Sequence, residues 1–146
     1  MIFRVNSQEM TEAVGRRLAA RLLENNKKRA FIALVGEMGV GKTVFTRGFA
    51  GALGISGVKS PTYTIVNEHR GEGGIRIYHF DLYRIESADD LESIGYYDYI
   101  ESDGFSIVEW PSHAEDDIPE GAIFVTISRV DGDVDARDIE ISGIDL

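Results

Sequence analysis

The sequence feature that most limits the fold of this chain is the segment GEMGVGKT at residues 36–43. It fits G-x-x-x-x-G-K-[ST], the pattern of loops that hold nucleotide phosphates. The preceding run KKRAFIALVG is apolar, has the length of a strand and ends in glycine, which is typical of a strand buried on both faces. The following segment, TVFTRGFAGAL, reads as a helix. Strand, loop and helix in this order give the pattern its specificity, so the segment predicts a phosphate site in an α/β fold.

A further helix is predicted near the start of the chain, after a short strand formed by residues 1–5. Asn6 and Ser7 are suitable residues to cap this helix, which covers residues 8–26. Its apolar side chains recur every four residues, at Met10, Val14, Leu18 and Leu22. That spacing places them in a single stripe, so we expect one face of the helix to be buried.

The middle of the chain reads first as strands and then as helix. Residues 63–70 and 74–83 flank the segment GEGG, which predicts a hairpin or two neighbouring strands. Residues 86–100 read as mostly helical, with Ser87 as a possible cap and acidic residues in the first turn.

The last third of the chain predicts one more buried strand and then a hairpin. The strand is GFSIVEW, at residues 104–110, and a loop with a proline follows it. Two alternating segments joined at Asp131-Gly132-Asp133 predict an antiparallel hairpin at the C-terminus. We therefore expect a single α/β domain over residues 1–146, with a central, mostly parallel sheet flanked by helices.

The residue types in the loop are those that nucleotide chemistry needs. Gly36, Gly39 and Gly41 permit backbone conformations that aim N–H groups at one point, and the helix that follows adds its positive N-terminal end. Lys42 supplies a positive charge for the β- and γ-phosphates. Thr43 offers its hydroxyl to Mg²⁺.

A magnesium-bound nucleotide also needs a carboxylate, and two candidates end predicted strands. Glu109 ends the apolar run FSIVE, and Asp81 ends the alternating run IYHFD. Both would lie where ligands bind in open α/β sheets, beyond the carboxyl ends of the strands. The alternative for each is a surface acid at a strand end. Beside these acids, His79 either orients a carboxylate or fills space, and we expect it to fill space; Trp110 is the only tryptophan and either packs in the core or lies against the nucleotide.

A polar segment, SPTYT at residues 60–64, follows the helix after the loop. In many proteins with this loop, a Thr or Ser in that region reaches Mg²⁺ and senses the γ-phosphate. Thr62 and Thr64 are the candidates here. The alternative is the start of a strand, with the geometry that a proline imposes on Ser60.

Charge and composition limit the partners that this chain can hold by itself. Residues 1–60 carry 10 Lys/Arg and 4 Asp/Glu, whereas residues 61–146 carry 5 and 21, and the net charge is −10. An acidic chain is poorly suited to grip a nucleic-acid backbone, so we expect a partner to hold any RNA. The alternative is that the acidic surface serves solubility. The absence of cysteine, of a long apolar run and of a signal-peptide pattern favours a cytoplasmic protein.

Taken together, these segments resemble the TsaE family, also called YjeE, of small P-loop ATPases in bacterial tRNA threonylcarbamoyladenosine synthesis. The resemblance runs over nearly the whole chain. It is carried in order by SQEMT, GEMGVGKTVFTRG, SPTYTIVNEH, YHFDLYRI, DLESIGYYDYI and VEWP. It implies a P-loop NTPase-like domain that uses ATP and Mg²⁺. Met38 and Val40 depart from residues common in the family, but neither change removes a glycine or a backbone N–H of the loop. After VEWP, where many members carry an acid, this chain has Ser112 and His113, which concerns the role of that segment and not Glu109.

The resemblance also implies roles for particular residues. The phosphate loop would run from Glu37 to Thr43, which includes Met38, Gly39, Val40 and Gly41, with Lys42 on the phosphates. Thr43 and Glu109 would be the Mg²⁺ ligands, and Asp81 would be the acid needed for hydrolysis. Thr11 would lie near the nucleotide and Trp110 near its base.

The same resemblance implies partners, namely the proteins TsaB and TsaD. TsaD transfers threonylcarbamoyl to adenosine 37 of tRNAs, and tRNA would therefore be contacted through the complex. ATP hydrolysis by this chain would support multiple turnover. No arginine can be assigned to the transition state from the sequence, with Arg84, Arg129 and a partner's arginine all open, so we expect slow hydrolysis by the chain alone.

Two other functions stay open at this point. A small-molecule kinase would need an acceptor pocket and usually a lid with arginines, but residues 111–122 contain no Arg or Lys. A nucleotide-gated binding module would use occupancy alone to set the affinity for a partner. A small GTPase is disfavoured because the chain has no N-K-x-D motif and Asp81 is followed by Leu-Tyr-Arg.

Overall fold

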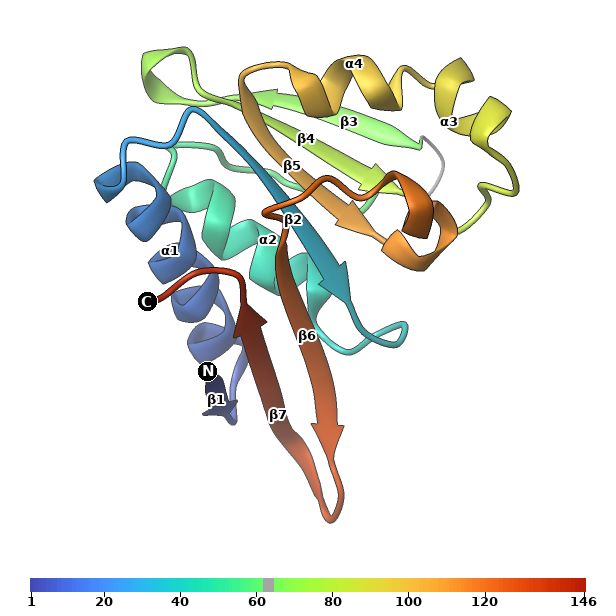
Figure 1. The fold of residues 1–146 in the computed structure, drawn as a ribbon. Coiled ribbons are helices and arrows are strands. Elements are labelled where there is room, and N and C mark those ends of the chain that lie inside the picture. The colour runs from blue at the N-terminus through green and yellow to red at the C-terminus, as the bar shows by residue number, and fades with distance from the viewer. Residues whose placement is uncertain (62–64) are drawn as a thin grey trace.

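The computed structural model describes residues 1–61 and 65–146 and shows an α/β fold built on one mixed sheet (Figure 1). Its strands are β1 (Ile2–Val5), β2 (Arg29–Val35), β3 (Val66–Arg70), β4 (Arg76–Asp81), β5 (Gly104–Glu109), β6 (Ile123–Val130) and β7 (Asp133–Ser142). Its helices are α1 (Gln8–Glu24), α2 (Lys42–Gly51), α3 (Ala88–Ser93) and α4 (Tyr96–Glu101), with short 3₁₀ segments η1 (Glu72–Gly74) and η2 (Pro111–Asp117). No helix of the described residues is long and apolar enough to cross a membrane.

The sheet has the order β1-β7-β6-β2-β5-β4-β3. The four central strands, β6, β2, β5 and β4, run parallel to one another, while β3 on one side and β7 and β1 on the other are antiparallel to their neighbours. The predicted α/β class, the parallel centre and the antiparallel C-terminal hairpin are therefore confirmed. The carboxyl ends of β2, β4 and β5 meet at one edge, since parallel strands all point the same way.

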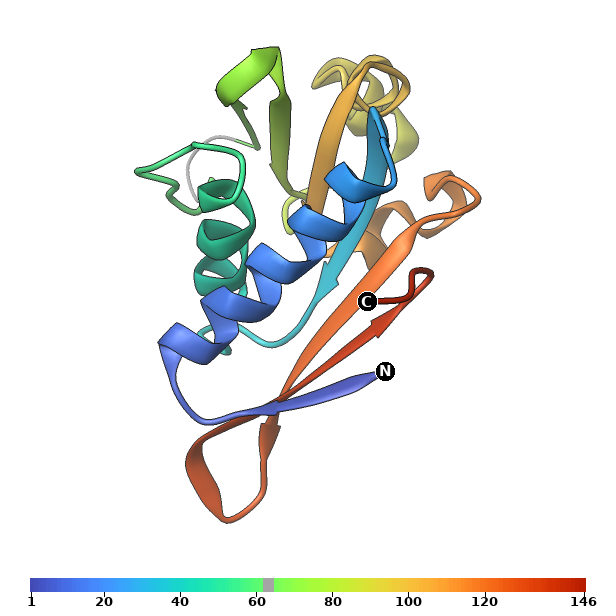
Figure 2. The ribbon, with the colours of Figure 1, turned by 90° about the vertical axis from the view of Figure 1, so that its left-hand side faces the viewer.

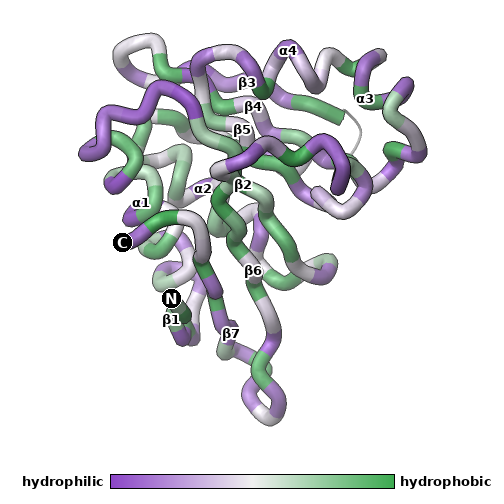
Figure 3. Tube along the Cα trace, viewed as in Figure 1, coloured by the Kyte–Doolittle hydropathy of each residue, from purple (hydrophilic) through white to green (hydrophobic). Residues whose placement is uncertain are grey.

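Helices cover both faces of the sheet. The helices α1 and α2 lie side by side on one face, and α3, α4 and η2 lie on the other (Figure 2). The core correspondingly has two apolar clusters, one under α1 and α2 and one under α3 and α4. Strand β2 separates them and is buried from Phe31 to Leu34, which explains its uninterrupted apolar sequence. Figure 3 shows hydrophobic residues concentrated in the central strands β2 and β5.

The helices α1 and α2 approach each other through two glycines. A Cβ on Gly48 of α2 would lie 2.6 Å from the carbonyl carbon of Glu12 in α1. A Cβ on Gly15 of α1 would overlap the carbonyl oxygen of Phe45. Real Cβ atoms do not come this close to backbone, so both crossing points require glycine. The first turns of α1 are thereby held against the helix that follows the phosphate loop.

Most predicted elements are found, with differences at their ends. The Ser7 side chain accepts a hydrogen bond from the backbone N–H of Met10 and so caps α1, as expected. The predicted stripe on α1 is wrong at Met10, which is 41% exposed. Thr11 is buried in its place, because the first turn of α1 faces the phosphate loop, where a small polar residue packs.

The predicted helical segment at residues 86–100 is divided in two. Gly95 has a φ of 78°, a left-handed conformation that ends the continuity between α3 and α4. The Ser87 side chain caps α3 by accepting a hydrogen bond from the N–H of Asp90. The hairpin between β3 and β4 is confirmed, as is the turn between β6 and β7.

Candidate functional site

The phosphate loop joins the carboxyl end of β2 to the N-terminus of α2, as the sequence predicts. Gly39 and Gly41 have φ values of 75° and 120°, which residues with a Cβ rarely adopt. Gly41 is also the N-cap of α2, and no side chain caps this end of the helix. The first N–H groups of α2 have no partner within the helix, so they are available to an anion at the positive end of its dipole.

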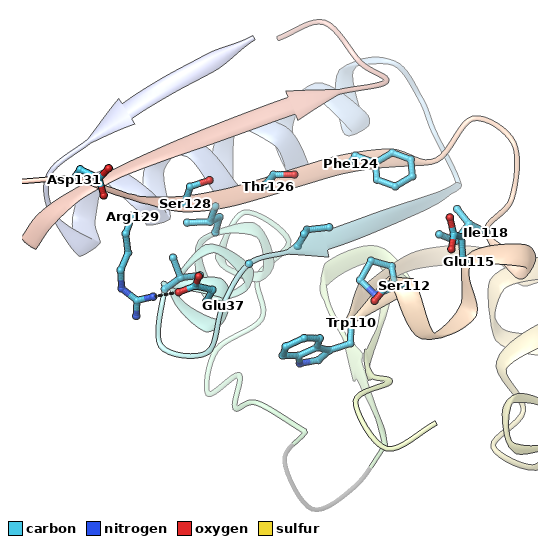
Figure 4. A pocket seen from close by; sticks show the side chains of 15 residues that line it. Glu37, Trp110, Ser112, Glu115, Ile118, Phe124, Thr126, Ser128, Arg129 and Asp131 are labelled. Carbon is cyan, nitrogen blue, oxygen red and sulfur yellow. Dashed lines mark hydrogen bonds and ion pairs between the residues drawn. The ribbon is translucent and has the colours of Figure 1, made fainter. Parts of the chain in front are cut away.

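Two arginines of the β6–β7 hairpin hold the loop in place. The guanidinium of Arg129 donates 2.7 Å to the carboxylate of Glu37 and 3.2 Å to the carbonyl of Met38 (Figure 4). The Nε of Arg137 donates 3.0 Å to the carbonyl of Val40. These contacts use the carboxylate of Glu37 and the carbonyls of Met38 and Val40 as acceptors, so the two arginines occupy none of the loop's N–H groups. Sequence reasoning missed this role, although it considered Arg129 as a possible arginine finger.

The register of the β6–β7 hairpin contains one indication that Arg129 and Arg137 share a binding partner. Arg129 and Arg137 are directly opposite each other on β6 and β7. Like charges in such a pair destabilise a sheet unless a common partner compensates them. The alternating pattern alone predicts that both side chains point to the same face of the sheet. That they contact the phosphate loop is seen only in the structure.

Lys42 and Glu109 form a buried ion pair behind the loop. Lys42 Nζ lies 3.6 Å from Glu109 Oε1, and the two residues are only 7% and 4% exposed. The other carboxylate oxygen, Oε2, lies 2.6 Å from Nε2 of His79, which is fully buried. A buried carboxylate requires such compensation, because burial without a partner disfavours its charge strongly. The expectation that His79 only fills space is therefore incomplete, since it contacts the candidate acid.

The second candidate acid, Asp81, lies on the neighbouring strand. In the β4–β5 register Asp81 is directly opposite Glu109, so both predicted carboxylates are at the same edge of the sheet. Asp81 is half-buried, and its Oδ1 accepts a hydrogen bond of 3.0 Å from the N–H of Tyr83. The other carboxylate oxygen of Asp81 is not held by this turn. The structure thus brings together the two acids that the sequence proposed on the strength of their strand ends.

Trp110 follows Glu109 in a left-handed conformation with a φ of 57°. This turn places its ring 4.7 Å from Lys42 Nζ, in the geometry of a cation–π contact. The ring also packs against Tyr83, with centroids 5.0 Å apart. Trp110 therefore lies at the end of the loop where Lys42 is expected to hold phosphates. Its predicted position near the base stays a prediction.

A pocket of about 830 Å³ adjoins the loop on the side of η2 (Figure 4). Glu37, Val40 and Trp110 line it together with residues of β6. A smaller pocket of about 180 Å³ adjoins the loop on the side of α1, where Thr11 lies beside Gly41. Thr43 is half-buried in the first turn of α2. The two pockets are thus lined from the loop by Glu37, Gly39, Val40 and Gly41. Thr62 and Thr64 lie outside the described residues.

The site fits a nucleotide-bound metal better than a metal held by protein alone. In the part of the chain that the structure describes, no group of three His, Cys, Asp or Glu residues has the geometry of a metal site. Mg²⁺ usually keeps several waters and takes one or two carboxylates plus phosphate oxygens, so a full protein cage is not needed. Glu109, at the end of β5, contacts Lys42, and Thr43 follows Lys42 in the first turn of α2. Their carboxylate and hydroxyl oxygens are the kind of donor that such an ion prefers.

Comparisons with known proteins agree with this geometry. Residues 5–139 match the family model "Threonylcarbamoyl adenosine biosynthesis protein TsaE". A tRNA threonylcarbamoyladenosine biosynthesis protein TsaE from Haemophilus influenzae is 41% identical over 129 residues, which are 87% of this chain and 79% of that protein. The protein of the same name from Bacillus subtilis is 36% identical over 143 residues, which are 97% of this chain and 85% of the relative.

A solved structure gives the same result for the fold. The crystal structure of Bacillus subtilis YdiB superposes with a TM-score of 0.74 at 31% sequence identity. The superposition covers 95% of this chain and 82% of that chain. The shared fold therefore includes both the central sheet and its antiparallel edges.

Proposed function

This chain belongs to the TsaE family of threonylcarbamoyl adenosine biosynthesis proteins, and from that premise we propose that it is an ATPase subunit of tRNA modification. It binds and hydrolyses ATP with Mg²⁺, in complex with TsaB and TsaD, and this hydrolysis supports turnover of the modification at adenosine 37. It acts as one domain over residues 1–146, in the cytoplasm, and tRNA is held by the complex. The observation that carries the proposal is the buried Lys42–Glu109 pair behind the glycine-rich loop.

The loop and its surroundings supply the binding of the triphosphate. Backbone N–H groups of Glu37–Thr43 and the N-terminus of α2 hold the phosphate oxygens. Lys42, which neutralises Glu109 in the structure, turns its charge to the β- and γ-phosphates. Thr11 and Trp110 contact the nucleotide from the α1 side and the η2 side of the loop, where each borders a pocket.

The metal is held by Thr43 and Glu109 together with the phosphates. When bound, Mg²⁺ neutralises phosphate charge and so favours the transition state of phosphoryl transfer. Glu109 is suited to this role because it is buried, paired with Lys42 and held through one oxygen by His79. With Lys42 directed to the phosphates, Oε1 of Glu109 would be available to hold the cation.

Asp81 is the residue that we assign to hydrolysis. It lies opposite Glu109 at the sheet edge, and the hydrogen bond from the N–H of Tyr83 holds only its Oδ1. The remaining oxygen orients the attacking water or accepts its proton, a contribution of roughly 10²–10⁴-fold in rate for a positioned base.

We expect slow hydrolysis by the isolated chain because Arg129 and Arg137 already have partners in the loop. Arg129 and Arg137 are engaged by acceptor groups of the loop, so neither is poised over the γ-phosphate. A partner that supplies a cation, or that releases Arg129 from Glu37, would accelerate hydrolysis, since a single arginine is worth roughly 10³–10⁵-fold in related reactions.

The test is a comparison of ATP hydrolysis by this chain alone and with TsaB, TsaD and tRNA, for the wild type and Glu109→Ala. We expect stimulation by the partners in the wild type and its loss in the variant. Hydrolysis of roughly 10 s⁻¹ or more by the chain alone, within the usual enzyme range, contradicts partner dependence.

The small-molecule kinase is retained as the alternative because the 830 Å³ pocket beside the loop is large enough for an acceptor. Hydrolysis that depends on a small acceptor molecule, with no response to TsaB and TsaD, would favour it. A nucleotide-gated binding module differs again, because it would keep full function in tRNA modification when Asp81 is replaced and hydrolysis is lost.

A further inference from the structure

His79 is a buried polar residue that the proposed mechanism does not use directly. It lies in β4, two residues before Asp81, and has no solvent exposure. Its Nε2 lies 2.6 Å from Oε2 of Glu109 on the neighbouring strand. Its other ring nitrogen, Nδ1, is buried and has no hydrogen-bond partner among the described residues.

The pairing determines which nitrogen of His79 carries the hydrogen. A carboxylate paired with Lys42 offers only acceptor oxygens, so in this pairing His79 donates from Nε2. Nδ1 then carries a lone pair, which is the less costly atom to bury without a partner, because a buried N–H would be an orphaned donor. An apolar side chain would fill this space without either requirement. A histidine at this position is consequently explained by its hydrogen bond and not by packing.

The hydrogen bond divides the two oxygens of Glu109 between two tasks. Oε2 is occupied by His79, and Oε1 faces Lys42 at the loop. Rotation of the carboxylate would break the contact with His79, so Oε1 is held toward the phosphate side. Ligating carboxylates in metal sites are commonly fixed by such a partner.

We propose that His79 is a positioning residue, which fixes the carboxylate of Glu109 so that Oε1 is presented to the divalent cation of a bound nucleotide. The proposal rests on the proposed function, in which Glu109 is a metal ligand. It adds a specific requirement, namely one N–H donor at the position of His79 Nε2.

The test uses three substitutions that differ in where they place a donor. The amide nitrogen of Gln is as many bonds from Cα as Nε2 of His, so His79→Gln retains the donor. His79→Asn places its amide one bond short, at the position of Nδ1, and His79→Leu has no donor. Tyr78→Phe is a matched control, because it removes one hydrogen bond of β4, from the Tyr78 hydroxyl to the carbonyl of Asp103, away from the site.

The readout is the binding of a fluorescent ADP analogue in EDTA and across a Mg²⁺ titration, with thermal unfolding of each variant as a check on folding. We expect the apparent Mg²⁺ affinity of the complex to fall roughly 10–100-fold in His79→Asn and His79→Leu. His79→Gln should restore it to within a few-fold of the wild type, and Tyr78→Phe should leave it unchanged. Asn is one methylene smaller than Gln and also leaves a cavity, so a packing role alone would lower the melting temperature of His79→Asn without a selective loss of Mg²⁺ affinity. The two readouts of this pair, taken together, decide even where His79→Leu fails to fold.

The role of Glu109 as a metal ligand and the positioning role of His79 are contradicted by different results. If Glu109→Ala weakens the Mg²⁺ dependence and His79→Asn does not, the positioning role of His79 is overturned while the metal site stands. If Glu109→Ala leaves the Mg²⁺ dependence of ADP binding unchanged, the metal site itself is overturned, and the role of His79 with it.

Discussion

Replacing Gly48 by alanine should destabilise the protein, because α1 and α2 cross at this residue. A Cβ there would lie 2.6 Å from both the carbonyl carbon and the Cα of Glu12, and closer still to its carbonyl oxygen. These are backbone atoms of α1, so no side-chain rotation relieves the overlap. The closest of these contacts, with the carbonyl oxygen, requires the helices to separate by about 1.5 Å to reach ordinary van der Waals distance.

The size of the effect follows from two opposing contributions. Overpacking costs typically about 1–3 kcal/mol, and we take about 3 kcal/mol because rigid backbone lies on both sides. The higher helix propensity of alanine stabilises the folded state by up to about 1 kcal/mol and offsets part of this cost. The free energy of unfolding should therefore fall by about 2 kcal/mol, and the melting temperature of this chain by roughly 6–8 °C.

The same helix offers a matched control for this measurement. Gly51 is exposed at the end of α2, and a Cβ there would meet no atom within 4 Å. Gly51→Ala makes the same chemical change without the overlap, so the melting temperature should stay constant or rise slightly. Thermal and urea unfolding of both variants, followed by circular dichroism, measure the difference.

A second readout connects the crossing to the site. Glu12 is next to Thr11, which borders the loop at Gly41, so displacement of α1 moves a wall of the pocket proposed to hold the nucleotide. Gly48→Ala should weaken ADP binding, whereas Gly51→Ala should not. Equal stability of the two variants would refute the claim that backbone contact at Gly48 sets the distance between the helices.

Three further predictions address single side chains. Lys42→Ala should weaken ATP binding at least tenfold by calorimetry, since it removes the charge assigned to the phosphates, and unchanged affinity would count against this use of the loop. Asp81→Asn should lower hydrolysis roughly 10²-fold or more while ATP affinity changes little; parallel losses of both would point to a binding role instead. Burial, and then the neighbouring His79, hold the pKa of His69 below its ordinary value of 6.5, so the unfolded chain takes up a proton that the folded chain resists. Stability should accordingly fall as the pH falls through 6.5, and urea unfolding across pH should show a shallower fall in His69→Gln.

The sequence could predict those parts of the site that depend on residues close together in the chain. The glycines of the loop, Lys42 and Thr43 form a contiguous pattern, and their strand–loop–helix context is equally local. Glu109 and Asp81 were predictable because both end strands, and the carboxyl ends of parallel strands meet at one edge.

The parts that sequence could not predict depend on contacts between distant residues. The hydrogen bond from His79 to Glu109 requires the register of β4 against β5, which no local pattern encodes. The arginines that hold the loop, Arg129 and Arg137, are more than 90 residues from their acceptors. The exposure of Met10 likewise follows from the approach of α1 to the loop and not from the helical period.

The strand order has a consequence for the timing of translation. Among the described residues, strand β2, which carries the phosphate loop at its end, pairs with β5 and β6 alone, and these lie between residues 104 and 130. The ribosome therefore releases the loop long before its neighbours and before the arginines that hold it. Nascent or truncated chains that stop ahead of β5 contain the complete GEMGVGKT segment without a sheet to support it. Newly made protein should consequently acquire a supported GEMGVGKT loop only after Arg129 and Arg137 have emerged.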